Sequence, residues 1–203
     1  MMRLGQKQVL GKVTKIDTAN SFVLSQRSWR IDKELSGGGP LMDMGIYSVQ
    51  GSIYTMGQNP VAITAKEGKK TKPAFFNEVE ESISWDMEFP NGVIAHGESS
   101  YVKNESKLRA DAENGWFEIS PAFGYGGLKG KTSEGKLNFP QVYEQVFQMD
   151  DFADCILRNR ETKVPGKMGL RDIKILEAIY QSAATGKRVD LNLTETVFSS
   201  SYW

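Results

Sequence analysis

The clearest pattern in the chain is a strict alternation of apolar and polar residues from residue 82 to residue 89. Four apolar side chains share one face of this extended segment: Ile83, Trp85, Met87 and Phe89. A period of two residues is typical of a β-strand with one buried face. The turn-forming residues 90–92 follow, and residues 93–101 resume an extended pattern, so the sequence predicts a β-hairpin. The apolar stripe belongs either to a core under helices or to a subunit interface.

Further strands are expected on both sides of this hairpin. Residues 12–19 alternate, residues 61–68 form a short apolar run, and a second hairpin is expected around the turn at 113–115. Four consecutive strands joined by short turns, two in each hairpin, predict an antiparallel sheet with one apolar face. The glycine-rich segment 121–135 is expected to form a loop or short edge strands.

Helical periodicity appears near the two ends of the chain. One helix is expected from Pro40 to Gly57, a second from residue 142 to about 159, and a third from 170 to a C-terminal cap at Gly186. Residues 188–193 are expected to close the chain as a last strand. Because strands cluster in the middle and helices at the ends, the fold class predicted is α+β, an open and largely antiparallel sheet with helices packed on one face.

Composition removes several classes of function. The 203 residues contain 25 basic and 25 acidic side chains with no basic stripe, so we expect no nucleic acid partner. One cysteine and one histidine give no cluster of metal ligands, so no metal site is expected. No apolar stretch approaches the roughly 20 residues of a membrane span, so we expect a soluble protein without a membrane partner.

The segment GGGPLMDMGIY, residues 37–47, contains the main candidate chemistry. Three glycines before a helix could bind a phosphate, or they could let the backbone approach a neighbour closely. Asp43 and Tyr47 lie four residues apart on the expected helix and therefore project from one face. A carboxylate and a phenol so placed can bind a sugar hydroxyl and move its proton. The alternative is a surface aspartate beside a half-buried tyrosine.

Trp29 and Arg30 form a second candidate pair, in the irregular segment before the glycines. An indole ring can stack on a sugar and a guanidinium can bind its hydroxyls. The same residues could instead anchor the loop, and the sequence leaves both interpretations open.

Four segments give the chain a resemblance to a known family: WRIDKELSGGGPLMDMGIY, WDMEFPNGVIAHGESSY, AENGWFEISPA and VPGKMGLRDIKILEAIYQSAATGKRVDL. The chain resembles the C-terminal domain of the glucose-fructose oxidoreductase, inositol dehydrogenase and rhizopine-catabolism (Gfo/Idh/MocA) family, in its glucose-fructose oxidoreductase-like branch. The resemblance implies the fold of a glyceraldehyde-3-phosphate dehydrogenase-like C-terminal domain. It divides the chain into the end of an interdomain helix (1–11), a single substrate-binding and oligomerisation domain (12–193) and a C-terminal tail (194–203).

The resemblance also implies roles for the candidate residues. Asp43 and Gly45 match an Asp-x-Gly-x-His pattern whose first and last residues face the substrate, and Tyr47 replaces the histidine. Tyr47 would then be the acid/base on the sugar hydroxyl, with Asp43 positioning it or the substrate. The implied substrate-binding residues are Trp29, Arg30, Gly38 and Gly39.

The implied reaction is hydride transfer between a sugar or polyol carbon and NADP or NAD. Family members begin with a Rossmann domain that carries the cofactor fingerprint and a Glu-Lys-Pro lysine, and this sequence contains neither. We therefore expect the chain alone to be inactive and to bind no cofactor tightly. Its expected partners are a sugar or polyol, the missing Rossmann domain and further copies of itself, paired through the open sheet face.

Two expectations are not decided by the residues. The alternative function is a stand-alone, non-enzymatic sugar-binding or assembly module that uses the same Asp43 face. A cytoplasmic location is expected, and a periplasmic one stays open because any targeting signal would precede the missing domain.

Overall fold

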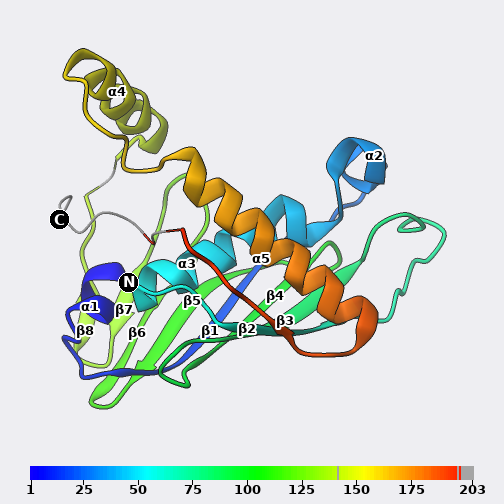
Figure 1. Cartoon of the computed structure of the whole chain (residues 1–203), viewed down its shortest axis with the longest axis horizontal. Helices are drawn as coiled ribbons and strands as arrows, with labels where there is room; N and C mark the ends of the chain where they lie inside the picture. The colour runs from blue at the N-terminus through cyan, green and yellow to red at the C-terminus, as the bar shows by residue number, and fades with distance from the viewer. Residues whose placement is uncertain (141, 196, 198–203) are drawn as a thin grey trace.

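A single open sheet dominates the computed structural model, which describes residues 1–140, 142–195 and 197. In these residues the sheet has nine strands in the order β8-β7-β6-β5-β1-β4-β3-β2-β9 (Figure 1). The strands are β1 Val13–Ser21, β2 Ala62–Glu67, β3 Ser82–Glu88, β4 Ile94–Ser100, β5 Glu105–Ala112, β6 Gly115–Ile119, β7 Gly130–Thr132, β8 Gly135–Leu137 and β9 Val189–Asp190. The predicted α+β class and largely antiparallel sheet are confirmed.

The central part of the sheet differs from the prediction of four consecutive neighbouring strands. Both predicted hairpins exist, β3 with β4 and β5 with β6. Between them lies β1, which runs parallel to β4 and antiparallel to β5. Turn residues report only local connections, so they could not reveal a strand inserted from about 80 residues earlier in the chain.

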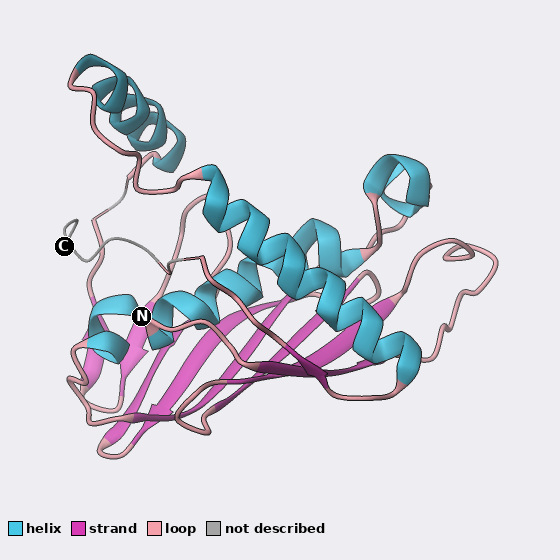
Figure 2. Cartoon of the chain, in the orientation of Figure 1, coloured by secondary structure: helices cyan, strands magenta, loops and turns pink. Residues whose placement is uncertain are grey.

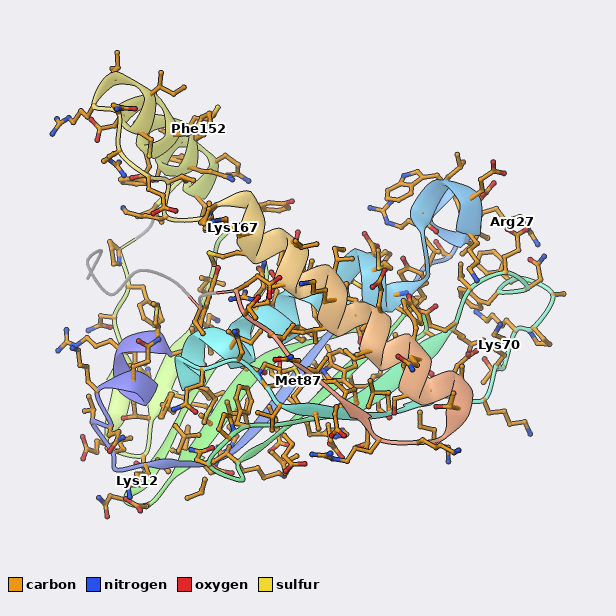
Figure 3. All side chains as sticks on the ribbon, viewed as in Figure 1. Lys12, Arg27, Lys70, Met87, Phe152 and Lys167 are labelled. Atoms are coloured by element: carbon orange, nitrogen blue, oxygen red, sulfur yellow. The ribbon has the colours of Figure 1, made fainter. Side chains whose placement is uncertain are left out.

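Two long helices cover one face of the sheet (Figures 1 and 2). These are α3 Ile46–Met56 and α5 Gly166–Thr185. Trp85 and Met87 of β3 are buried in one cluster with Ile53 of α3 and Ile179 of α5, and Figure 3 shows Met87 between α5 and the sheet. The apolar stripe of residues 83–89 is therefore core under the helices, which resolves the alternative left open by the sequence.

The helix α4, Glu144–Leu157, differs from the prediction in its packing. Its amphipathic pattern suggested a helix on the sheet, but α4 stands away from the sheet (Figure 2). Only Cys155 of this helix is buried. Periodicity defines an apolar face without defining what covers it, so the prediction of the helix was right and its packing on the sheet was wrong.

The segment before α3 contains more regular structure than the sequence suggested. The predicted irregular loop holds a 3-10 turn, Trp29–Ile31, and the short helix α2, Lys33–Ser36. The helix expected to begin as an α-helix at Pro40 instead opens with one π-helical turn, η2 Leu41–Gly45, and becomes α-helical at Ile46. Single π turns of this kind are frequent at functional sites.

The two ends of the chain contain little regular structure among the described residues. Near the N-terminus lies a short helix, α1 Met2–Gln6. The predicted last strand at 188–193 is reduced to the two residues of β9. Within the predicted tail, residues 196 and 198–203 lie outside the described residues.

The sheet face turned away from the helices is polar. Charged side chains alternate with buried ones along the central strands, and several form ion pairs, such as Arg109 Nη2 with Asp111 Oδ1 at 2.7 Å. Arg109 also lies over the ring of Trp116, with its Cζ atom 4.3 Å from the ring centroid. His96 Nδ1 lies 2.7 Å from Asp86 Oδ1 on the same face.

The described residues lack a membrane-spanning helix and a cluster of metal ligands. None of their helices is both long and apolar enough to cross a membrane. No group of three or more histidine, cysteine, aspartate or glutamate side chains among them is placed to bind a metal ion.

Candidate active site

Asp43 is the centre of a polar cluster above the sheet. Its Oδ2 atom accepts a hydrogen bond from Arg30 Nε at 2.8 Å and another from the hydroxyl of Tyr101 at 3.0 Å. The side chain of Asp43 is 18% exposed, so it is largely buried and still reaches solvent. No described residue donates a hydrogen bond to Oδ1. The carboxylate is thus oriented by two donors and keeps one oxygen available to a ligand hydroxyl.

Arg30 joins Asp43 to an aromatic surface. Its guanidinium carbon lies 4.6 Å from the ring centroid of Trp29 and 5.9 Å from that of Phe22. The Trp29 ring is 51% exposed. Of the two alternatives for this pair, the ion pair with Asp43 makes Arg30 an anchor, and the Trp29 ring lies open next to it. Binding of a sugar by this pair stays a prediction.

Tyr101 was missed by the sequence analysis. It follows β4 directly, and its side chain is fully buried, in contact distance of Phe22 with ring centroids 5.4 Å apart. Burial and the neighbouring Asp43 carboxylate raise the pKa of the phenol above its ordinary value, so Tyr101 remains a hydrogen-bond donor to Asp43. A usable signal existed: Tyr101 continues the alternation of Ala95, Gly97 and Ser99, the face of β4 that lies under the helices.

Tyr47 lies on the first turn of α3 and is 49% exposed. Its ring centroid lies 6.4 Å from that of Phe123, in the glycine-rich loop. No described residue hydrogen-bonds its hydroxyl. The ring of Tyr47 is therefore positioned by packing, and no side-chain hydrogen bond among the described residues joins Tyr47 to Asp43.

Gly38 and Gly39 have a packing reason for lacking side chains. A Cβ atom on Gly38 would lie 2.2 Å from the Tyr180 hydroxyl, and one on Gly39 would lie 2.5 Å from the main-chain oxygen of Glu80. Close approach of the backbone, one of the two alternatives for these glycines, is what the structure contains. Direct contact of either glycine with a sugar stays a prediction.

The main-chain N–H groups of this segment are not available to a phosphate. Gly39 N donates to Glu80 Oε2 at 3.0 Å, and Leu41 N donates to Glu80 Oε1 at 3.1 Å. A buried carboxylate thus lies where an anionic ligand would bind. The described residues do not fit the phosphates of a dinucleotide here, so this segment is not a cofactor cradle.

The packing around position 45 explains why the Asp-x-Gly pattern has a glycine there. A Cβ atom on Gly45 would lie 2.8 Å from Leu41 Cδ1 and 3.2 Å from the Trp85 ring. The π-helical turn therefore rests directly on the buried indole of β3. This close packing sets the distance between the backbone of the π turn, which carries Asp43, and strand β3.

The sequence analysis also missed Glu80 and Tyr180, which support the site from below. Burial raises the pKa of Glu80, although the N–H groups of Leu41 and Gly39 and the Tyr180 hydroxyl oppose that shift. Nothing in the sequence around residue 80 distinguishes a buried glutamate from a surface one. Both residues contact the glycine segment only because distant parts of the chain meet there.

The fold and this cluster define an open-sheet α+β domain that carries, at a π turn, a carboxylate oriented by two hydrogen-bond donors. Comparison with known families agrees, since residues 1–120 match the family described as GFO/IDH/MocA C-terminal domain. The chain belongs to the GFO/IDH/MocA family. The resemblance and the fold expected from the sequence are therefore both confirmed.

Relatives of this chain are sugar dehydrogenases and oxidoreductases by name. In structure it is similar to the aldose-aldose oxidoreductase from Caulobacter crescentus complexed with glycerol, with 36% identity and a TM-score of 0.89 over 94% of this chain and 59% of that one. In sequence it is 27% identical to D-xylose 1-dehydrogenase [NADP(+)] of Haloarcula marismortui over 81% of this chain and 47% of the relative. It is 26% identical to D-glucoside 3-dehydrogenase of Escherichia coli over 79% of this chain and 51% of the relative. The chain thus spans about half the length of these curated relatives.

Proposed function

We propose that the chain is the substrate-binding domain of an NAD(P)-dependent oxidoreductase that acts on a CH–OH group of a sugar or polyol. The observation that carries the proposal is the oriented Asp43 carboxylate with one free oxygen, next to the exposed Trp29 ring. The names of the relatives support a sugar as the substrate class and NADP or NAD as the cofactor class. When bound, the nicotinamide would supply the hydride chemistry.

In this proposal the residues of the chain have distinct tasks. Asp43 Oδ1 accepts a hydrogen bond from a substrate hydroxyl while Arg30 and Tyr101 keep the carboxylate in place. The Trp29 ring packs on a face of the sugar. Tyr47, in its phenolate form, takes up the proton of the hydroxyl that is oxidised and becomes the neutral phenol. Tyr47 is 49% exposed, and no described residue hydrogen-bonds its side-chain oxygen.

The cofactor is proposed to bind to a separate domain, because the N–H groups of Gly39 and Leu41 in the glycine segment already donate to Glu80 and are not free for its phosphates.

The exposed apolar surface of α4 supports the presence of a partner domain. Its apolar side chains are 50 to 85% exposed: Val146, Phe147, Met149, Phe152, Ile156 and Leu157. Figure 3 shows Phe152 on this projecting helix. An apolar helix face of this size is typical of an interface, and we propose that it packs on the cofactor domain.

A hybrid enzyme tests the proposal. It joins the part of the Caulobacter crescentus aldose-aldose oxidoreductase that this chain does not match, about two fifths of that protein, to the N-terminus of this chain. We expect the hybrid to oxidise aldoses or polyols with NADP⁺ or NAD⁺, and the 203-residue chain alone to show neither turnover nor tight cofactor binding in calorimetry. Phe147→Ser with Phe152→Ser should lower hybrid turnover without changing the melting temperature of the chain alone.

The outcomes separate the alternatives. A hybrid that binds cofactor and turns over none of the sugars or polyols contradicts the proposed function. If the isolated chain binds sugars and the hybrid does not turn them over, the non-enzymatic binding module is favoured. A melting temperature of the isolated chain that falls sharply with the α4 substitutions would show that this face belongs to the chain's own core.

We also propose that the open sheet face forms a homo-oligomer. The support is Trp116, which lies between two cations on that face, 4.3 Å from Arg109 Cζ and 5.5 Å from Lys131 Nζ. Tryptophan and arginine are the residues most enriched at the energetic centres of interfaces. We expect sedimentation analysis to find a dimer or larger assembly, and Trp116→Glu to yield monomers. A wild-type chain that stays monomeric at high protein concentration contradicts this proposal.

A further inference from the structure

We propose that Glu80 is a positioning residue of the sugar site, which fixes the main chain that carries Asp43. The inference rests on the role proposed above for Asp43. Glu80 is 5% exposed and lies two residues before the start of β3, 41 residues after Gly39, which it contacts. No hydrogen bond among the described residues joins the Glu80 and Asp43 side chains, so its influence on the site passes through the backbone.

Three donors among the described residues hydrogen-bond the Glu80 carboxylate. Oε2 accepts from Gly39 N at 3.0 Å, and Oε1 accepts from Leu41 N at 3.1 Å and from the Tyr180 hydroxyl at 2.9 Å. Both N–H groups belong to the entry of a helix, where they have no partner inside the helix. An ionised carboxylate, which only accepts, suits this set of three donors.

The peptide groups around Gly39 connect Glu80 to Asp43. The N–H of Gly39 donates to Glu80, and the carbonyl oxygen of Gly39 accepts from Asp43 N at 3.2 Å. The neighbouring carbonyl oxygen of Pro40 accepts from Ser99 Oγ at 2.8 Å. A shift of the Gly39 peptide therefore reaches the backbone of Asp43 directly, and the absence of room for a Cβ at Gly39 leaves the segment little freedom to move.

Glu81 provides a matched comparison in the next position. It is 1% exposed and also binds main-chain donors, Thr71 N at 2.9 Å and Lys72 N at 2.8 Å, both at Oε2. Its Oε1 atom accepts from Thr71 Oγ1 at 2.7 Å. These partners lie in the loop before β3 and not in the glycine segment. Two adjacent buried glutamates thus fix two different segments, of which only one carries Asp43.

Replacement by glutamine separates the two positions chemically. At position 81 the amide oxygen can accept from both N–H groups while its NH₂ group donates to Thr71 Oγ1, so all partners stay satisfied. At position 80 the two N–H groups bind different oxygens, so either orientation of the amide places an NH₂ group against a main-chain N–H. An unpaired buried donor is costly, and the glycine segment must move to relieve it.

The experiment compares Glu80→Gln with Glu81→Gln by two readouts. In the 203-residue chain, NMR should show shifted amide resonances from Gly38 to Gly45 and a shifted Asp43 carboxyl carbon in Glu80→Gln, and changes confined to the loop near Thr71 in Glu81→Gln. In the hybrid enzyme, Glu80→Gln should raise the sugar KM about tenfold or more with the cofactor KM unchanged, and Glu81→Gln should leave both unchanged.

The two readouts distinguish this inference from the proposed function. A hybrid that binds cofactor and turns over none of the sugars or polyols contradicts the proposed function, while the NMR comparison still tests the role of Glu80. Glu80→Asp covers the case in which Glu80→Gln does not fold: it retains both acceptor oxygens on a shorter side chain, so we expect a folded protein with a sugar KM between those of wild type and Glu80→Gln. An Asp43 carboxyl resonance and sugar KM unchanged in the folded variants would overturn the inference.

Discussion

Replacing Tyr47 with phenylalanine in the hybrid enzyme is expected to lower kcat for sugar oxidation by about 10²- to 10⁴-fold, the usual contribution of general acid–base catalysis. The physical reason is that the hydroxyl is the only part of the side chain removed. Tyr47 is 49% exposed and its hydroxyl has no hydrogen-bond partner among the described residues, whereas the ring keeps its contact with Phe123. Stopped-flow measurement of NADPH or NADH formation gives the rate directly.

The control for Tyr47→Phe is Tyr125→Phe, the same change at a tyrosine that is 87% exposed in the glycine-rich loop. We expect this variant to keep wild-type kcat. We also expect both variants to keep the wild-type melting temperature and cofactor KM, because neither hydroxyl contributes to the described packing. A Tyr47→Phe enzyme with a kcat within about threefold of wild type would remove Tyr47 from the proton-transfer step.

The largest expected effect on stability comes from Arg171→Leu. Arg171 and Asp172 are both fully buried on α5, with Arg171 Nη2 2.6 Å and Nε 2.8 Å from Asp172 Oδ1. Gln50 of α3 donates to the other carboxylate oxygen at 2.7 Å, so the pair fastens the two helices that cover the sheet. Removing the arginine leaves a buried carboxylate without its cation, which costs about 3 to 5 kcal/mol.

Urea unfolding of the 203-residue chain measures this cost, and the melting temperature should fall by roughly 6 to 20 °C. Lys174→Leu on the same helix is the control, because its ion pair with Glu195 is 42% exposed at the lysine and should contribute less than about 1 kcal/mol. The double variant Arg171→Met with Asp172→Leu should recover most of the loss, since no charge stays buried. An Arg171→Leu chain as stable as the Lys174→Leu chain would contradict the prediction.

The expected elements were found where local pattern and turn chemistry agree. The alternation at residues 82–89 and the turn at 90–92 predicted β3 and its hairpin, and the periodicity before Gly186 predicted α5. The same reasoning failed where the partner of a segment comes from elsewhere in the chain. The amphipathic pattern of α4 did not indicate that its apolar face lies off the sheet.

The candidate site shows the same division. Residue type and spacing made Asp43, Tyr47, Trp29 and Arg30 candidates, and the family resemblance implied their catalytic and binding roles, which stay predictions until they are measured. The sequence could not find Tyr101, Glu80 or Tyr180, because what distinguishes them is burial against the segment around Asp43.

The sequence by itself determined the α+β class, the two hairpins, the main helices and the resemblance to the GFO/IDH/MocA C-terminal domain. These depend on side-chain alternation, helical periodicity and short motifs, which act over a few residues. Only the tertiary structure decided that β1 lies between β4 and β5, that the residue 83–89 stripe is core, and that Asp43 is oriented by Arg30 and Tyr101. These features arise from contacts between residues far apart in the chain, whose free energy depends on burial and geometry that no local pattern contains.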